Sequence, residues 1–328
     1  MLYSLKDWAM VKTIFALLAV CLISGTSFAQ AGGAPPITPA HAWVNPTQSM
    51  LLDVARAGTR IVAVGEHGII VLSDDAGKTF RQATAVPASV TLSAVYFSDA
   101  EHGWAVGQWG VILASTDGGE HWTLQRSDAS TDQPLFSVYF KDAQHGWAVG
   151  LWSLMLATQD GGRTWSQVTL PAPPGGGKAD RNLYKVFANH EGHLFVVAEQ
   201  GTVLRSRDDG ASWEYRSTGN KGSLWTGTVA ADDTLFVGGL LGHLYWSHDD
   251  GDSWTALDSG SSGSITDLVS SASQVIGVGL DGFVIRDVAG AGHFKAAQRH
   301  DREPLTAVLI PDSGVPLLFS KDGIVPAE

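Results

Sequence analysis

One short segment that ends in a glycine turn recurs seven times along the chain. It reads Val-Gly-Glu-His-Gly at 64–68 and Val-Gly-Gln-Trp-Gly at 106–110. The last residues of the seven copies lie at positions 68, 110, 153, 201, 242, 282 and 323, so the steps are 42, 43, 48, 41, 40 and 41 residues. Repeats of roughly 40–45 residues are typical of chains that form a ring of small β-sheets. The period therefore favours one repeat domain over the two domains that a length of 328 residues suggests.

Each repeat divides into four expected strands. In the second repeat they span 92–97, 103–106, 111–115 and 122–125, where apolar and polar residues alternate between Gly and Asp turns. Helical periodicity is not sustained in any window, so we expect almost no helix. The predicted fold is an all-β, seven-bladed β-propeller of four-stranded antiparallel blades.

Closure of the ring needs a strand from elsewhere in the chain. The sequence ends at Glu328, before the seventh repeat has room for its fourth strand. Natural sheets avoid unpaired edges. We therefore expect residues around His41-Ala42-Trp43-Val44 to supply the outer strand of the last blade. This makes 30–49 a linker and closing strand, and 50–328 the propeller.

The first 29 residues have the pattern of a secretory signal peptide. Lys12 precedes an apolar run at 14–23, and Ser27-Phe28-Ala29 offers a small-residue cleavage site. The run is shorter than the about 20 residues that span a membrane. Cys21, the only cysteine, lies within this segment, so the mature chain is expected to form no disulfide. The alternative is a lipoprotein signal at 18–21, although Val20 is bulky for it. We expect a periplasmic or otherwise exported protein.

The composition excludes several classes of function. The chain carries 44% hydrophobic residues, which is incompatible with disorder. Its formal net charge of -12 argues against general affinity for nucleic acid or anionic lipid, because phosphate contacts need Lys and Arg. The 38 glycines and 12 tryptophans are an excess that the repeated turns and blade cores explain.

A second segment, S/T-x-D-x-G-x-T/S-W/F, recurs between the third and fourth strands of five repeats. The Asp can accept main-chain N–H bonds within its turn, the Gly permits positive φ, and the aromatic residue caps the blade core. The Asp and Gly residues of the five copies are Asp75, Gly77, Asp117, Gly119, Asp160, Gly162, Asp208, Gly210, Asp249 and Gly251. Calcium loops need denser oxygen ligands. We expect a structural role, with no metal and no cofactor.

These segments resemble the Asp-box, or bacterial neuraminidase (BNR), repeat of sialidases and several non-enzymatic propellers. The longer unit at 94–97, 102–107 and 117–119, restated at 137–140, 145–150 and 160–162, is similar to the photosystem II stability and assembly factor family. The resemblance covers roughly residues 50–328. It implies a propeller that binds membrane-protein partners during assembly, without catalysis. The acidic balance, with no run of arginines along the central repeats, favours a client other than the photosystem, such as a transporter.

The two faces of the expected propeller differ in charge. Sixteen acids and four bases lie in the turns on the Asp-box side, against eleven acids and nine bases on the other side. The less acidic face is the predicted docking surface for a protein partner. The alternative is that its charges are ordinary solvated loop residues. The candidate partner-binding bases are Arg126, Arg181, Arg216, Arg299 and Arg302.

Apolar residues also occupy turn tips on that face. Trp109, Trp152, Leu240 and Leu241 stand where other repeats carry polar residues such as Glu66. Exposed aromatic residues often mark contact sites, because Trp supplies much of the energy in binding hot spots. Each residue could instead pack into a neighbouring blade. The Pro- and Gly-rich connection at 171–180 lies on the same face and is either a lip of the docking surface or a tolerated insertion.

A glycosidase is the alternative function, since sialidases share the repeat. The resemblance to them would require an arginine cluster, a tyrosine nucleophile with a glutamate, and an acid. Tyr184 near Arg181, or Glu303 near Arg302, could serve, but the first blade lacks an Arg-Ile-Pro segment. Residues 189–193 hold two histidines without the spacing of a zinc site. We expect no catalytic residues.

Overall fold

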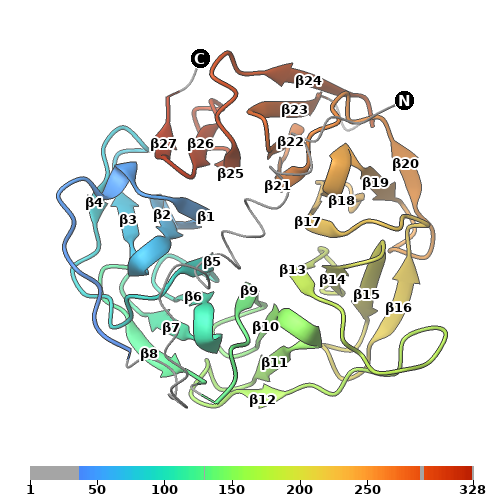
Figure 1. The fold of residues 1–328 in the computed structure, drawn as a ribbon, viewed down its shortest axis with the longest axis horizontal. Helices are drawn as coiled ribbons and strands as arrows, with labels where there is room; N and C mark the ends of the chain where they lie inside the picture. Colours follow the sequence, from blue (N-terminus) through green and yellow to red (C-terminus); the bar gives the residue numbers. More distant parts are fainter. Residues whose placement is uncertain (1–36, 129, 289–291, 327–328) are drawn as a thin grey trace, which may run out of the picture. The chain divides into compact units, whose positions relative to one another are not determined.

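Each sequence repeat forms one antiparallel sheet. The structure, a computed structural model, describes residues 37–128, 130–288 and 292–326, and the expected signal peptide lies outside them. Within the unit that comprises residues 34–328, seven sheets follow one another around a ring (Figure 1). The first strand of blade 1 packs against the first strands of blades 2 and 7, which closes the ring. The predicted seven-bladed β-propeller is confirmed.

The strand boundaries follow the repeat. Blades 1 to 3 consist of β1 (Leu51–Ala57), β2 (Arg60–Gly65), β3 (Ile70–Ser73) and β4 (Arg81–Gln82); β5 (Leu92–Phe97), β6 (Gly103–Gly107), β7 (Ile112–Ser115) and β8 (Thr123–Arg126); and β9 (Leu135–Phe140), β10 (Gly146–Gly150), β11 (Met155–Thr158) and β12 (Ser166–Gln167). Blades 4 and 5 consist of β13 (Leu183–Ala188), β14 (Leu194–Ala198), β15 (Thr202–Ser206) and β16 (Glu214–Ser217); and β17 (Leu224–Val229), β18 (Leu235–Gly239), β19 (Leu244–Ser247) and β20 (Thr255–Leu257). Blades 6 and 7 consist of β21 (Ile265–Ser271), β22 (Gln274–Gly279), β23 (Phe283–Val288) and β24 (Phe294–Gln298); and β25 (Leu305–Leu309), β26 (Leu317–Ser320) and β27 (Gly323–Val325). The strands expected for the second repeat agree with β5–β8 within one residue at each end.

Helical structure among the described residues is limited to single 3-10 turns. They are η2 (Pro46–Gln48), η3 (Glu66–Gly68), η4 (Gln108–Gly110), η5 (Leu151–Ser153) and η6 (Leu240–Gly242). In the part of the chain that the structure describes, no helix has the length and apolar character needed to cross a membrane.

The hydrophobic core lies between the blades. The middle strands, such as β6 and β7, are buried along their whole length, because a neighbouring blade covers each of their faces. Trp104 of blade 2 stacks on Phe140 of blade 3, with ring centroids 3.4 Å apart. Phe140 in turn meets Trp165 edge to face at 5.7 Å. The tryptophans of the repeat thus act at the joints between blades, as their periodic spacing predicts.

The first strand of each blade lies nearest the centre of the ring, and we call it the inner strand (Figure 1). Every inner strand carries a bulge at its second residue. The register shifts there in all seven blades, between Leu51 and Asp53 in β1 and at the matching point in the others. A bulge re-aims the neighbouring side chain. In four blades the third residue of the inner strand accepts a hydrogen bond from the next blade, and we call these the inter-blade acceptor bonds. They are Val95 N to Asp53 Oδ2 (2.9 Å), Val186 N to Ser137 Oγ (3.2 Å), Leu268 N to Thr226 Oγ1 (3.1 Å) and Val308 N to Asp267 Oδ2 (3.1 Å).

The closing strand expected at 41–44 does not form there. In the described residues, blade 7 contains three strands, β25–β27. The segment 38–43 instead bonds along the outer side of blade 1: Ala40 N donates to Val86 O at 2.9 Å, and Gln82 Nε2 donates to His41 O at 2.7 Å. The turn η2, which follows this segment, contacts β27. Pairing of 38–43 with the loop after β4 satisfies their backbone groups, so they do not join the last blade.

A network of charges joins blade 4 to blade 5. Arg205 in β15 is fully buried and pairs with Glu214 (2.7 Å) and with Asp252 of the next Asp-box (2.9 Å). It also donates to the main-chain carbonyl of Asp250. Arg207 pairs with the same two aspartates from a half-exposed position. We call this network the Arg205 clasp.

We predict that Arg205→Met destabilises the protein by about 2–4 kcal/mol, because it leaves buried acceptors without a donor and brings acids together without their counter-ion. Arg207→Met is the matched control and should cost less than about 1 kcal/mol, since exposed pairs contribute little. Urea unfolding of both variants measures the difference. Equal losses of unfolding free energy in the two variants would show that the burial of Arg205 does not strengthen the joint between blades 4 and 5.

Candidate functional site

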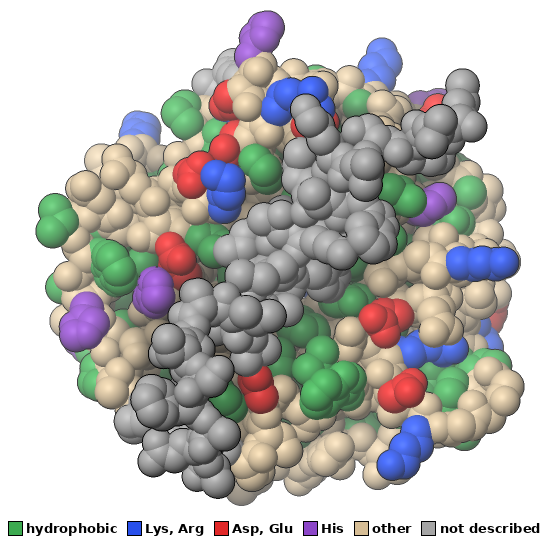
Figure 2. Space-filling view, in the orientation of Figure 1, with side chains coloured by type: hydrophobic (Ala, Val, Ile, Leu, Met, Phe, Trp, Pro, Cys, Tyr) green, Lys and Arg blue, Asp and Glu red, His purple; other side chains and the backbone are tan. Residues whose placement is uncertain are grey.

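The turns after the second strands form a ring of tips on one face, which we call the tip face. Their middle residues have left-handed backbone, as at Trp109 (φ 57°), Trp152 (φ 53°) and Leu241 (φ 59°). Bulky side chains rarely adopt this conformation, because Cβ crowds the following carbonyl. Acidic, basic and hydrophobic side chains are interspersed on the face of the protein that Figure 2 shows.

Two of the four apolar tips predicted from the sequence are strongly exposed. Trp152 and Leu241 each expose 59% of their surface. Leu240 is half-buried. Trp109 packs against the hydrophobic cluster between blades 1 and 2, which is the alternative that the sequence left open. The exposed pair lies in blades 3 and 5, on either side of the blade 4 turn at Glu199 and Gln200.

The predicted partner-binding arginines all have partners within the protein. Arg126 donates to Gly110 O at 2.7 Å, and buried Arg299 pairs with Asp301 at 2.8 Å. Arg181 donates to Gln200 Oε1 at 3.2 Å and lies 5.8 Å from the Tyr215 ring centroid. Arg302 pairs with Asp281 at its own turn. These contacts fix the loops of the tip face, and Arg181 and Arg302 keep partly exposed guanidinium groups there.

Two of the nine bases that the sequence placed on the less acidic face, Arg216 and Lys185, lie elsewhere. Arg216 pairs with Glu214 (2.8 Å) and Asp252 (3.2 Å), so it belongs to the Arg205 clasp. Lys185 lines the central channel. Both residues lie in strands, β16 and β13, so the alternation of side chains along the strand and not the charge of a loop sets the side on which each one lies. Aligning the seven inner strands could have revealed Lys185, since it shares the third position with Asp53 and Asp267.

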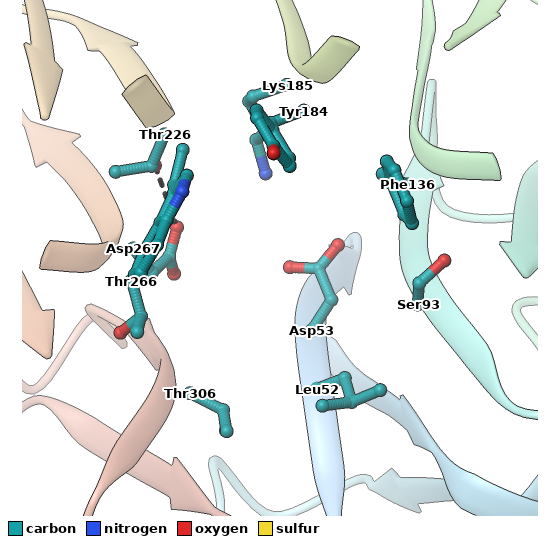
Figure 3. A pocket seen from close by; sticks show the side chains of 11 residues that line it. Leu52, Asp53, Ser93, Phe136, Tyr184, Lys185, Thr226, Thr266, Asp267 and Thr306 are labelled. Carbon is teal, nitrogen blue, oxygen red and sulfur yellow. Dashed lines mark hydrogen bonds between the residues drawn. The ribbon is translucent and has the colours of Figure 1, made fainter. Parts of the chain in front are cut away.

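The central channel holds these three charges from blades 1, 4 and 6. Figure 3 shows Lys185 pointing into the space between Asp53 and Asp267. The cavity measures about 80 Å³ and is also lined by Phe136, Tyr184 and Trp225. Its volume is enough for a few water molecules, each of which needs roughly 30 Å³. The channel is therefore a narrow polar core with aromatic residues along part of its wall.

The charged groups in the channel shift one another's pKa values. Burial raises the pKa of Asp267 to about 6, and repulsion from Asp53 adds to the effect. Burial opposes the charge on Lys185, but Asp53 and Asp267 together hold its pKa above the usual value. Lys185 therefore stays protonated at neutral pH and is unsuited to act as an amine nucleophile.

The five Asp-boxes have the local bonding that the sequence predicts. In the third copy, Asp160 Oδ1 accepts from Thr164 N at 2.9 Å and Oδ2 accepts from the Thr164 hydroxyl at 2.7 Å. Thr158 Oγ1 accepts from Gly162 N at 2.9 Å, and Gly162 has φ 85°. The bonds to Thr164 lower the pKa of Asp160 to about 2. The Asp-box carboxylates are thus committed to their own turns.

The candidate catalytic and metal-binding residues are not brought into one site. Tyr184 lies in blade 4, where burial raises its pKa to about 12, and Glu303 lies before blade 7, 3.7 Å from Lys321. His190 and His193 pair separately with Asp233 (2.8 Å) and Asp250 (3.0 Å). Within residues 37–128, 130–288 and 292–326, no three His, Cys, Asp or Glu side chains are placed to hold a metal ion.

The ring of seven blades and its bonded turns define an Asp-box β-propeller. Residues 82–179 match the sequence model of a family described as Photosynthesis system II assembly factor YCF48. This match confirms, over the second and third repeats, the resemblance found from the sequence. No curated protein sequence matches the chain.

Solved structures with this fold include two of YCF48. YCF48 bound to D1 peptide has a TM-score of 0.69 and 18% identity, with 90% of this chain and 97% of that chain covered. YCF48 from Cyanidioschyzon merolae has a TM-score of 0.66 and 17% identity, with 85% and 95% covered. Streptogramin B lyase, at a TM-score of 0.71 and 12% identity, covers 85% of this chain and 93% of its own. At these identities the structures establish the propeller fold.

We predict that Asp160→Ala lowers the melting temperature at pH 7 by a few degrees, because three turn donors lose their acceptor. A carboxylate whose folded pKa lies below its unfolded value stabilises above the unfolded pKa, and the effect disappears as pH falls through the folded pKa. The difference from the unmodified protein should therefore shrink between pH 4 and pH 2. Asp132→Ala, in an exposed loop, is the control. Thermal unfolding followed by circular dichroism from pH 2 to 7 measures both, and a difference that stays constant with pH would contradict the role of the charge.

Proposed function

We propose that this protein is an exported, non-catalytic scaffold that binds a protein partner while a membrane-protein complex is assembled or stabilised. The observation that carries the proposal is the pair Trp152 and Leu241, which are 59% exposed at tips with left-handed backbone. A strained conformation that persists at an exposed apolar residue suggests a functional constraint, because folding alone would favour Gly or Asn there.

The surroundings of the pair make the tips rigid. Trp152 N donates to Asn182 Oδ1 at 3.0 Å, and Asn182 in turn donates to Glu199 Oε1 at 3.0 Å. Leu241 N donates to Ser264 Oγ at 3.1 Å. Tips that are fixed before binding lose little conformational entropy when a partner covers them. Trp152 and Leu241 are therefore the residues we assign to partner binding, with Leu240, Arg181 and Arg302 as further candidates on the same face.

The comparisons support a protein partner. The family matched over 82–179 is described as an assembly factor, and one YCF48 structure contains a bound D1 peptide. The acidic net charge of -12 leads us to propose a membrane assembly other than the photosystem, such as a transporter, as the client. Secretion through the signal at 1–29 would deliver the propeller to the side of the membrane where the folded parts of such a client are exposed.

We predict that changing both Trp152 and Leu241 to Ala reduces recovery of the partner by roughly tenfold or more, since hot-spot residues typically contribute at least 2 kcal/mol. The measurement is affinity purification from the source cells after cross-linking, with the bound proteins quantified by mass spectrometry. We expect subunits of one membrane complex, and the double variant should lose them while its melting temperature stays unchanged.

Val315→Ala is the matched control, because Val315 is 54% exposed in the β25–β26 connection on the opposite face. It should retain the partner. Undiminished recovery with the double variant would exclude the tip face as the docking surface. Loss of the partner with Val315→Ala as well would show that the effect is not specific to the tips.

A further inference from the structure

A pocket of about 440 Å³ lies between blades 3 and 4 on the Asp-box side. Known small-molecule sites measure roughly 300–1,000 Å³. The walls come from the β9–β10 turn (Lys141, Asp142 and His145), from β11 and the residue after it, Gln159, and from the blade 4 Asp-box at 208–211. Trp147 of β10 also lines the pocket. The pocket is remote from the tips that the proposed function uses, because it opens on the other face.

In the part of the chain that the structure describes, the joint between blades 2 and 3 contains hydrogen bonds that the joint between blades 3 and 4 lacks. Between blades 2 and 3, Trp104 Nε1 donates to the carbonyl of Gly161 at 3.3 Å, and Gln125 Nε2 donates to the same carbonyl at 2.8 Å. These two donors fasten the Asp-box of blade 3 to blade 2. In blade 3 the residue that matches Gln125 is Val168, which has no side-chain donor. The joint between blades 3 and 4 therefore lacks this pair of bonds among the described residues, and the ion pair of Lys141 with Asp209 at 2.6 Å bridges it instead.

This difference between the joints leaves the indole of Trp147 without a bond. Trp147 is 4% exposed, yet its Nε1 has no hydrogen-bond partner among the residues that the structure describes. Gly210 provides the room beside it, since a Cβ at that position would lie 2.3 Å from Nε1. The Nε1 atom itself is not sealed from solvent, because it reaches the wall of the pocket. A ligand that brings an acceptor to Nε1 can therefore take its hydrogen bond.

The charges of the walls limit the chemistry of that ligand. Three carboxylates line the pocket with two basic side chains, and most of them are already paired: Lys141 with Asp209 at 2.6 Å and His145 Nδ1 with Asp142 at 3.0 Å. Asp208 is bonded within its own Asp-box turn. The excess of carboxylates disfavours an anion. A simple cation cannot accept from the indole N–H. The ligand must accept from Trp147, donate to the carboxylates and carry little charge, and hydroxyl groups do all three.

We propose that the pocket between blades 3 and 4 binds a neutral sugar. A sugar carries a hydroxyl on almost every carbon, so it can accept from Trp147, bond Gln159 and donate to the lone pairs that Asp142 and Asp209 keep beside their existing bonds. A peptide offers only one N–H and one carbonyl per residue and fits the density of polar groups less well. The exposed side chain of Gln159 supplies both a donor and an acceptor at the entrance.

The test is isothermal titration calorimetry of the purified mature protein with glucose, galactose, N-acetylglucosamine and maltose. N-acetylneuraminic acid, a sugar with a carboxylate, serves as the anionic comparison. We expect one site per chain for at least one neutral sugar and weaker binding of the acid. Trp147→Phe keeps the ring but removes the N–H, and it should weaken binding by about three- to tenfold. Ala211→Trp, at an exposed position on the pocket wall, should abolish binding by filling the space.

Trp104→Phe is the matched control, because its N–H is already bonded within the protein. It should leave sugar affinity unchanged and lower the melting temperature more than Trp147→Phe does. The proposal is overturned if none of the neutral sugars binds, if N-acetylneuraminic acid binds more tightly than they do, or if Trp147→Phe and Ala211→Trp both keep full affinity. None of these results depends on the partner bound at the tip face.

Discussion

The ring depends on the hydrogen bonds by which one inner strand holds the next. Asp53, Ser137, Thr226 and Asp267 each accept from a main-chain N–H of the following blade, from the position that a bulge turns inwards. Two of the acceptors are carboxylates in a narrow channel, where unpaired charge is costly. Lys185 supplies positive charge at the same level of the ring. The channel is thus occupied by groups that maintain the joints, which leaves the two faces free for binding.

The outer parts of the blades are joined by donors that differ from joint to joint. In three Asp-boxes the residue directly after the Asp offers its carbonyl to the preceding blade: Arg60 bonds it at Gly118, Trp104 and Gln125 at Gly161, and Arg205 at Asp250. Different side chains can therefore donate to the same main-chain carbonyl position. Repeats can diverge at this position as long as some donor remains. Where blade 3 has Val168, the donor is lost and a pocket results.

The repeat period was enough to predict the fold, the strand boundaries of the second blade and the bonding of the Asp-boxes, because each of these is local or recurs with the repeat. Predictions that depended on contacts between blades were less successful. The segment at 41–44 bonds to blade 1 and not to blade 7, since the loop after β4 offers closer partners. Arg216 bonds to Asp252 of the next blade, and Trp109 packs between blades 1 and 2, which is the alternative that the sequence left open. Which blade a side chain contacts depends on the side of the strand that its residue occupies. The composition of the loops does not reveal that side.

The departures from the repeat are where specific function is expected. A residue that recurs in most blades, such as the Asp of the Asp-box, is already bonded within its own turn and has few free lone pairs for a ligand. Trp152 and Leu241 depart from the polar, left-handed tips at His67, Gln200 and Asp281, and Val168 departs from the donor at Gln125. The first change places apolar surface on one face, and the second leaves Trp147 unbonded on the other. Because the ring is held together by bonds at the channel and at the other joints, it can tolerate both changes without losing its closure.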